Sequence, residues 1–570
     1  RPGYLVLADS YFPGWQAQVD GKEVAIYRAD LNFRALYLGS GQHTVVFKYS
    51  PLSFKLGLFV SFLSGVVVLM GLAVWTWQRF YREEEGDREL RRVVKNSIIP
   101  MITSLLNKAM DFAFAMLMLR LLGPIGSGRL GYAVNLWLFL SIVTDFGLGT
   151  LTTREVAKDR SRANRYLTNT AVVRLGLSLF SLLPILAVLA LNRSLTGDTV
   201  AAIALLWVSL APGGIASSLS YLFNAYERFE YPALITVIAK LTSTFLGVMV
   251  LLFGGGIVGL AAVSLLVNLL TAGILYALVR RSLFVPRWEY EPSLVRSMLK
   301  DSYPLMLNNL LSTIFFRVDV QLLQPLKGDA VVGYYNAAYR YIDGLNIIPS
   351  NFTLAIFPML SRYAASGREA MLRTYVLSLR YLVIVAMPLA VGMAAVAREL
   401  VLLLGGSQFL PHSMIAMQLL VWFLPFSFIN SVTQYVLIAL NQQRFLTLAF
   451  AIGVAFNIIA NAIFIPIYSY QAAAVITVLS EIVLLVPFYY SVRVNLAPIP
   501  WLGILWRPAA AAALMGGSFW WLARLIPSLA ALPVAAVVYV LALVALGTFT
   551  KEDIDLARKL ISGFPSQRGI

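Results

Sequence analysis

Nine charged side chains fall near the middle of long apolar stretches of this sequence, and these are its best candidates for chemistry. They are Lys108, Asp111, Asp145, Lys240, Arg317, Asp319, Arg340, Asp343 and Glu481. A charged side chain at the centre of a bilayer costs about 2.5 to 3.5 kcal/mol on insertion scales if it faces lipid. The pattern therefore indicates an interior that contains water or in which the charges pair with one another. Such an interior is typical of proteins that transport a polar substrate.

The basic members of this set suit an anionic ligand. A phosphate that enters a low-dielectric cavity needs fixed cations, and the planar guanidinium of arginine matches its geometry best. Asp111 lies one helical turn from Lys108, and Asp343 one turn from Arg340, so each pair can share a face of its helix. We therefore predict substrate binding by Lys108, Asp111, Arg174, Lys240, Arg317 and Arg340, and charge pairing or ion coupling by Asp145, Asp319, Asp343 and Glu481.

Each of these assignments has an alternative. The pairs of Lys108 with Asp111 and of Arg340 with Asp343 are also consistent with static structural ion pairs. Arg174 lies about two turns inside the end of its stretch, where a long side chain can reach the interface instead of gating a cavity. Asp145 and Glu481 can either pair with neighbouring helices or bind a coupling cation, and the sequence does not separate these two roles.

The elements that position these residues are about fifteen apolar stretches, most of them of about 20 to 28 residues, the length that crosses a bilayer core about 30 Å thick. Hydrophobic residues make up 59% of the chain and charged residues 13%. The mean hydropathy is +0.76. Together these values exclude an ordinary soluble domain. The fold class predicted is an all-α polytopic membrane protein.

Composition also excludes several kinds of site. The chain has no cysteine and only two histidines, His43 and His412, so it offers no thiolate or zinc centre, and no cofactor is predicted. The net charge of +17 does not indicate nucleic acid, because the basic residues sit in alternate loops instead of one patch.

Those basic loops set the orientation. By the positive-inside rule the loops rich in Lys and Arg are cytoplasmic. Fourteen spans then follow residue 96, beginning and ending inside, and the first span of the chain runs from outside to inside. The fourteen are 97–122, 130–152, 167–191, 200–221, 232–253, 257–279, 303–326, 331–360, 375–396, 413–440, 445–467, 470–490, 505–525 and 530–549.

The predicted organisation has six parts. They are a β-rich extracytoplasmic segment (1–52), a transmembrane helix (53–78), a charged cytoplasmic linker (79–95), two six-helix bundles (96–295 and 296–492), and two accessory helices with a cytoplasmic tail (493–570). The first part carries five short strand-like runs and an Asp20-Gly21 hairpin signal. Because its core is small, and because the chain opens at Arg1, we expect it to be the end of a larger extracytoplasmic domain or to lean on the membrane.

The two bundles echo each other in sequence. Leu121-Leu122-Gly123-Pro124 is followed by Gly131-Tyr132, and Leu322-Leu323-Gln324-Pro325 is followed by Gly333-Tyr334. Both copies end a charged span at the predicted outer face, turn and re-enter. The echo predicts two parallel, pseudo-symmetric bundles around a central site.

Several segments carry a family resemblance. The stretch Leu119 to Pro124, the run Asp145-Phe146-Gly147-Leu148-Gly149 and the run Val332 to Tyr339 resemble Wzx-type polysaccharide flippases of the MOP exporter superfamily. The resemblance covers about residues 96–559. The segment Ala8 to Trp15 with Val19-Asp20-Gly21-Lys22 resembles the C-terminal end of YfhO-type membrane proteins, without the part that would carry sugar-transfer chemistry.

The resemblance implies a transporter, not an enzyme. It implies alternating access, in which a polyprenyl-pyrophosphate oligosaccharide passes from the inner to the outer leaflet of the cytoplasmic membrane for cell-surface polysaccharide synthesis. The implied partners are membrane lipids, this glycan and polysaccharide polymerase or glycosyltransferase machinery, with no nucleic acid. The alternative is a cation-coupled multidrug exporter of the same superfamily, which would be expected to place acids in its cavity without this surplus of deep bases.

Overall fold

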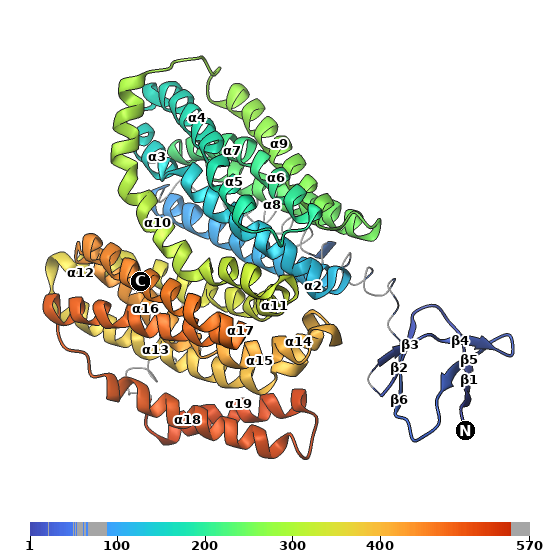
Figure 1. Cartoon of the computed structure of the whole chain (residues 1–570). Helices are drawn as coiled ribbons and strands as arrows, with labels where there is room; N and C mark the ends of the chain where they lie inside the picture. Colours follow the sequence, from blue (N-terminus) through green and yellow to red (C-terminus); the bar gives the residue numbers. More distant parts are fainter. Residues whose placement is uncertain are drawn as a thin grey trace, which may run out of the picture. The chain divides into compact units, whose positions relative to one another are not determined.

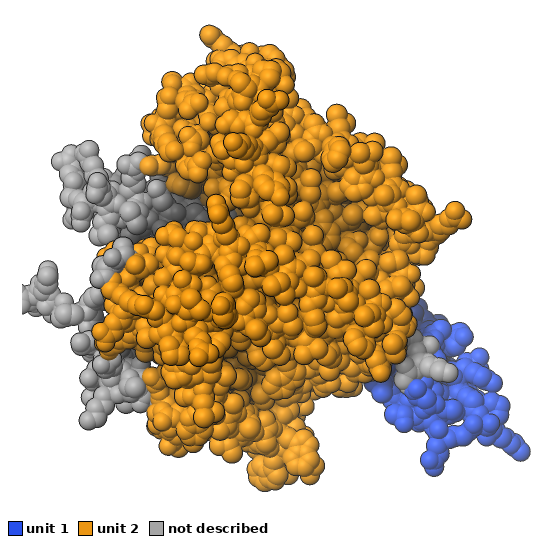
Figure 2. Space-filling view, turned by 60° about the vertical axis from the view of Figure 1, so that its left-hand side comes forward, with its two compact units in different colours: residues 1–93 blue, residues 94–570 orange. Residues whose placement is uncertain are grey.

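The computed structural model describes residues 1–20, 22–49 and 88–548, with a few isolated positions between 51 and 65; of residues 22, 23, 88–105, 365 and 366 only the backbone is considered. The chain divides into two compact units, residues 1–93 and 94–570 (Figure 2). The predicted transmembrane helix 53–78, most of the linker 79–95 and the predicted cytoplasmic tail lie outside the described residues.

The first unit is built from two three-stranded antiparallel sheets, with strand orders β1-β5-β4 and β3-β2-β6. Its strands are β1 (Gly3–Ser10), β2 (Trp15–Val19), β3 (Lys22–Val24), β4 (Tyr27–Ala29), β5 (Phe33–Leu38) and β6 (Val45–Tyr49). One of the five runs predicted as a strand, Val24 to Tyr27, is not a single strand. The chain leaves one sheet after Val24 and joins the other at Tyr27, so two short strands replace it.

A buried arginine lies in the small core of this unit. Arg34 is 1% exposed, pairs with Asp9, and stacks on the ring of Trp15 at 3.6 Å from its centroid. Near the hairpin, Val19 pairs with Lys22, and the carboxylate of Asp20 lies 2.7 Å from His43 Nδ1. The hydrogen bond with His43, and then the one from the Thr44 amide, hold the pKa of Asp20 below its ordinary value.

The second unit is helical, and each span predicted after residue 96 falls mainly on helix (Figure 1). Its helices are α2 (Arg88–Asp145), α3 (Leu148–Lys158), α4 (Ala163–Phe180), α5 (Leu182–Leu191), α6 (Gly197–Val208), α7 (Leu210–Ala225), α8 (Glu230–Leu252), α9 (Gly256–Ser282), α10 (Pro292–Lys327), α11 (Asp329–Leu345), α12 (Ile347–Ser366), α13 (Arg368–Ala395), α14 (Ala397–Leu404), α15 (His412–Leu420), α16 (Phe423–Ala439), α17 (Gln443–Asn495), α18 (Trp501–Leu522) and α19 (Ser528–Ala545). Two 3-10 turns, Arg160–Arg162 and Ser407–Phe409, complete it.

Among the described residues, eight helical segments are long and apolar enough to cross a membrane, or nine if the bent pair α15 and α16 is one span. Two of the eight have 53 residues, more than twice the about 20 that one crossing needs. Each of these two contains a non-helical position, Gly123 or Ser469. A polytopic helical membrane protein follows, whereas the count of fourteen spans stays a prediction.

The helices of this unit form two groups in space. Helices α3 to α9 pack mainly on one another, and α11 to α17 do the same, with α18 and α19 packed together and against α13 (Figure 1). Helix α10 belongs to both groups, because it contacts α3 and α4 as well as α11 and α17. The boundary between the groups is therefore crossed by one long helix.

Candidate functional site

A bidentate ion pair joins the two helices that follow the boundary. Arg317 of α10 donates from Nη2 to both carboxylate oxygens of Asp343 on α11, at 2.9 and 2.8 Å. Both side chains are about a quarter exposed, and the guanidinium lies 5.0 Å from the ring centroid of Tyr339. Such a pair is strongly oriented and still within reach of solvent.

A second ion pair lies across the boundary, on the first group. Lys240 of α8 pairs with Asp111 of α2, and their side chains are 31% and 45% exposed. Arg340 of α11 is a third base close to both pairs. It is exposed, and the charges of Asp343, Arg317 and Asp111 all act on it. We call these five residues the charge cluster: Asp111, Lys240, Arg317, Arg340 and Asp343.

The charge cluster has three bases and two acids, so it carries a surplus of positive charge. Lys108, one turn from Asp111 on α2, is exposed and adds a fourth base nearby. A site of this sign, partly open to solvent and built from helices of both groups, can hold an anion.

The ion pairs within single helices, which the sequence left open as an alternative, do not form. Asp111 pairs with Lys240 instead of Lys108, and Asp343 pairs with Arg317 instead of Arg340. In both cases the carboxylate pairs with a base on a neighbouring helix, and the base one turn away on its own helix forms no ion pair with it. Within residues 106–548, Lys108 and Arg340 form no salt bridge, so both charges stay available to a ligand.

Arg174 belongs to a different place. Its side chain is 2% exposed, pairs with Asp145, and donates to the Gly214 carbonyl at 2.7 Å and to Ser218 Oγ at 2.9 Å. The sequence left open whether the Arg174 side chain reaches the membrane interface, and the structure shows that it does not. This pair lies inside the first group and lines a cavity of about 340 Å³.

Asp319 and Glu481 are buried without a salt bridge in the described part of the chain. Asp319 is 3% exposed and accepts hydrogen bonds from Tyr335 and from Thr477, the latter at 3.5 Å. Glu481 is 1% exposed and accepts from Asn430 Nδ2 at 2.5 Å. The second group therefore buries these two acids among neutral partners.

The two copies of the sequence echo meet face to face. A Cβ added at Gly128 on α2 would lie 1.8 Å from the Asp329 carbonyl oxygen, and one added at Gly333 on α11 would lie 2.0 Å from the Pro124 carbonyl oxygen. The backbones can approach this closely only because both residues are glycine. We call this contact the glycine seam. Arg129 Nε also donates to Asp329 at 2.9 Å across it.

Neutral polar residues that the sequence did not single out extend the seam. Asn192 donates to Gln324 Oε1 at 2.5 Å, and Gln324 donates to Asp329 at 2.9 Å. Asn and Gln occur in many of the predicted spans of this chain, so the echo beside them was the one signal available. Gln324 and Arg317 are seven residues apart, as are Gly333 and Arg340, so the charge cluster begins about 10 Å along each helix from the seam.

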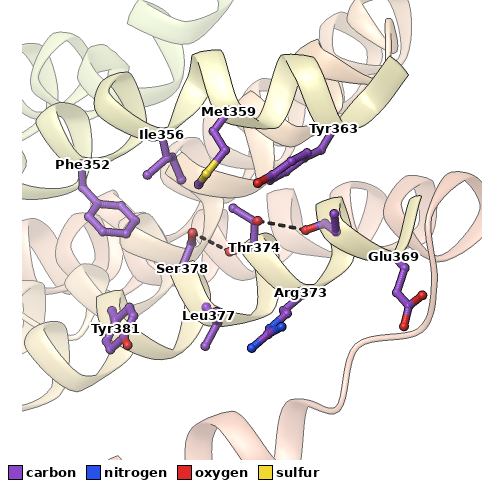
Figure 3. A pocket seen from close by; sticks show the side chains of 11 residues that line it. Phe352, Ile356, Met359, Tyr363, Glu369, Arg373, Thr374, Leu377, Ser378 and Tyr381 are labelled. Carbon is purple, nitrogen blue, oxygen red and sulfur yellow. Dashed lines mark hydrogen bonds between the residues drawn. The ribbon is translucent and has the colours of Figure 1, made fainter. Parts of the chain in front are cut away.

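Two further cavities differ from the charge cluster in chemistry. A groove of about 730 Å³ lies between α12 and α13, where Thr374 and Ser378 turn their hydroxyls to the carbonyls of Ala370 and Thr374 (Figure 3). The remaining wall is mainly aromatic and aliphatic, with Glu369 and Arg373 on α13. A cavity of about 690 Å³ between α15 and α17 is almost wholly apolar. Both suit hydrocarbon better than phosphate.

Comparison with known proteins gives one consistent result. The polysaccharide biosynthesis protein family matches residues 93–364, the lipid II flippase MurJ family matches residues 280–541, and the bacterial membrane protein YfhO family matches residues 2–61. A protein described as an O-antigen transporter of Shigella dysenteriae is 23% identical over 355 residues, which are 62% of this chain and 87% of that protein.

Solved structures agree in fold. The lipid II flippase MurJ in an inward closed conformation has a TM-score of 0.66 at 16% identity, covering 78% of this chain and 98% of that one. An inward-facing multidrug resistance MATE family transporter of the MOP superfamily has a TM-score of 0.54 at 20% identity, covering 70% and 97%. The resemblance to Wzx-type flippases of the MOP exporter superfamily that the sequence predicted is confirmed, and so is the resemblance of the first segment to YfhO-type membrane proteins.

Proposed function

We propose that this protein moves a polyprenyl-pyrophosphate oligosaccharide from the inner to the outer leaflet of the cytoplasmic membrane, for cell-surface polysaccharide synthesis. The matching families are those of polysaccharide biosynthesis proteins and a lipid II flippase, which are transporters rather than enzymes. The observation that carries the proposal is the charge cluster, whose surplus of bases suits a pyrophosphate. Arg317, Arg340, Lys240 and Lys108 would bind the anion, with Asp111 and Asp343 holding two of these bases in place while the site is empty.

The mechanism proposed is alternating access between two six-helix bundles. Helices α2, α10 and α11 each carry both a seam residue and a residue of the charge cluster. A rigid-body movement that parts the glycine seam would therefore open the charge cluster to the side of the membrane on which the seam lies. By the positive-inside rule the seam faces outward, the YfhO-like segment is extracytoplasmic and the C-terminus is cytoplasmic.

The proposed driving force is the membrane potential. A pyrophosphate-linked cargo carries about two negative charges, and each is worth about 2.3 kcal/mol per 100 mV, so outward passage gains about 4 to 5 kcal/mol per 100 mV. Asp145, Asp319 and Glu481 are alternative sites for a coupling cation. Asp145 suits that role less, because Arg174 already neutralises it.

The test is flipping of a fluorescent polyprenyl-pyrophosphate oligosaccharide in proteoliposomes that hold the purified chain. With an imposed potential and no sodium or proton gradient, we expect flipping that the Arg317→Ala variant loses. Flipping that ignores the potential but follows one ion gradient would move Asp319 and Glu481 to the centre of the mechanism. Export of cationic drugs without any flipping would replace the proposal with the multidrug alternative.

A further inference from the structure

The cavity beside Asp145 and Arg174 differs in composition from its surroundings. It has about 340 Å³, within the range of about 300 to 1,000 Å³ typical of small-molecule sites. It is lined from α2, α4, α7, α9 and α10, and Ile142 and Leu210 are its two aliphatic residues. The polar lining residues include Trp137, Ser141, Ser217, Asn268 and Asn309. Inside a membrane-spanning helix group, a lining with this many polar side chains favours a polar occupant.

The charges in this cavity compensate one another. Asp145 pairs with Arg174, which is itself fixed by Gly214 and Ser218, so the pair is close to neutral. A pyrophosphate would need surplus bases, and a cationic drug would need an unpaired carboxylate. Neither is available here, which leaves a neutral polar ligand.

The remaining groups suit the hydroxyls of a sugar. Trp137 Nε1 is buried with no acceptor in the described residues. Asn309 is exposed, and its side chain makes no hydrogen bond with any described residue. The side chain of Asp145 is 33% exposed. Sugar hydroxyls donate to carboxylates and amide oxygens and accept from amides and indoles, while a ring C–H face stacks on an aromatic surface.

One helix connects this cavity to the charge cluster. Asn309, Thr313 and Arg317 lie on one side of α10, at steps of four residues. The eight residues from Asn309 to Arg317 correspond to about 12 Å along the helix. A ligand whose phosphates lie at Arg317 can therefore place a sugar at Asn309.

We propose that this cavity is a sugar subsite, which binds a ring of the cargo close to its pyrophosphate. This inference rests on the proposed function and adds a determinant of cargo specificity that is separate from the charge cluster. The phosphates would provide affinity at Arg317, and the cavity would distinguish a glycosylated lipid from a bare prenyl pyrophosphate.

The test uses the purified full chain in detergent and two soluble probes, farnesyl pyrophosphate and farnesyl-pyrophosphoryl-N-acetylglucosamine. We expect the wild type to bind the sugar-bearing probe about tenfold more tightly, because one or two hydrogen bonds are added. The variants Asn309→Leu and Trp137→Leu should each remove most of that preference. Binding of farnesyl pyrophosphate should stay unchanged, which also shows that the variants are folded.

Asn308→Leu is the matched control, because Asn308 is the neighbouring asparagine on α10 and does not line the cavity; it accepts a hydrogen bond from Thr447. This variant should keep the full preference. Equal binding of both probes by the wild type, or an undiminished preference in Asn309→Leu and Trp137→Leu, would overturn the sugar subsite alone. A wild type that binds neither probe would overturn the proposed function and the subsite with it.

Discussion

The two ends of α10, the helix shared by both groups, are held by different kinds of interaction. At one end the glycine seam brings backbone against backbone, so that a single added carbon would lie within 2.0 Å of a carbonyl oxygen. At the other end the segment 284–291 enters α10 and is held to α4 through side chains. Asn164, Thr168 and Asn169 bond the backbone of Arg287, Glu289 and Glu291 at 2.8 to 3.4 Å.

This difference bears on how the molecule can move. Backbone contact through small residues is tight but includes few long side chains, so the seam can part as a unit and close again in one register. Side-chain to backbone bonds keep the entry to α10 attached to the first group while the helix beyond it moves. We infer that the seam is the gate and that the 284–291 segment is the tether.

The largest effect is expected from adding one methyl group to the seam. Gly333→Ala should force the seam apart at a cost of about 1 to 3 kcal/mol, which corresponds to a shift of about five- to 150-fold in the closed population. The chain has no cysteine, so Asn336→Cys provides a single reporter on the seam. Its alkylation by an impermeant maleimide from outside should rise by at least about fivefold.

Gly344→Ala is the control for that experiment, because it lies on the same helix and a Cβ there would meet no atom within 4 Å. It should leave the alkylation rate unchanged. If both alanine variants behave alike, the close approach at Gly333 does not hold the gate and the comparison of the two ends fails.

The sequence predicted the positions of charge better than their partners. A base or acid within an apolar stretch stands out from one chain alone, which is why Arg317, Asp343 and Asp111 were found. Their partners depend on how helices cross, and the one-turn spacing that offered Lys108 and Arg340 as partners contains no information about that crossing. In the sequence the glycine seam appeared only as the repeated Gly-Tyr pair, because neither copy of the repeat shows that the two copies contact each other. Trp137 and Asn309 carried no signal, since such residues are ordinary in membrane helices.

An effect of comparable size, on ligand binding instead of on the closed population, is expected at the charge cluster, between the two ends. Arg317→Ala removes the bidentate base and leaves Asp343 as a partly buried unpaired acid, which repels a pyrophosphate. We expect binding of farnesyl pyrophosphate to fall by about 30-fold or more, in line with the cost of about 2 to 5 kcal/mol for truncating one member of such a pair. Arg296→Ala, an exposed arginine at the start of the same helix, should change binding by less than about twofold. Equal losses in both variants would show that only net charge matters.

A smaller effect is expected from the ion pair across the seam. Arg129 and Asp329 are 27% and 14% exposed, so Asp329→Asn should weaken closure by about 0.5 to 1 kcal/mol, or two- to fivefold in maleimide labelling of the Asn336→Cys reporter. High salt should reduce the difference in labelling between the Asp329→Asn variant and the protein that keeps Asp329, because salt partly screens the pair of Arg129 and Asp329. A change as large as that of Gly333→Ala would show that charge, and not backbone contact, holds this end.

The smallest effect is expected at the tether. Hydrogen bonds from Ser293 and then Arg165 hold the pKa of Glu291 below its ordinary value of 4.5. A lowered pKa in the folded state means that this carboxylate stabilises the tether above about pH 4.5 and that the contribution is lost as the pH falls through the lowered pKa. Because the Glu291 side chain is 36% exposed, the loss is modest. Protection of the Arg287 and Glu289 amides from hydrogen exchange, corrected for the intrinsic rate, should therefore decline less than about threefold on acidification.

In Glu291→Gln the same modest loss should already be present at neutral pH and should not grow with acid. A tether that opens fully in that variant, while the seam reporter stays protected, would show that Glu291 alone joins α10 to the first group and that Asn164, Thr168 and Asn169 do not.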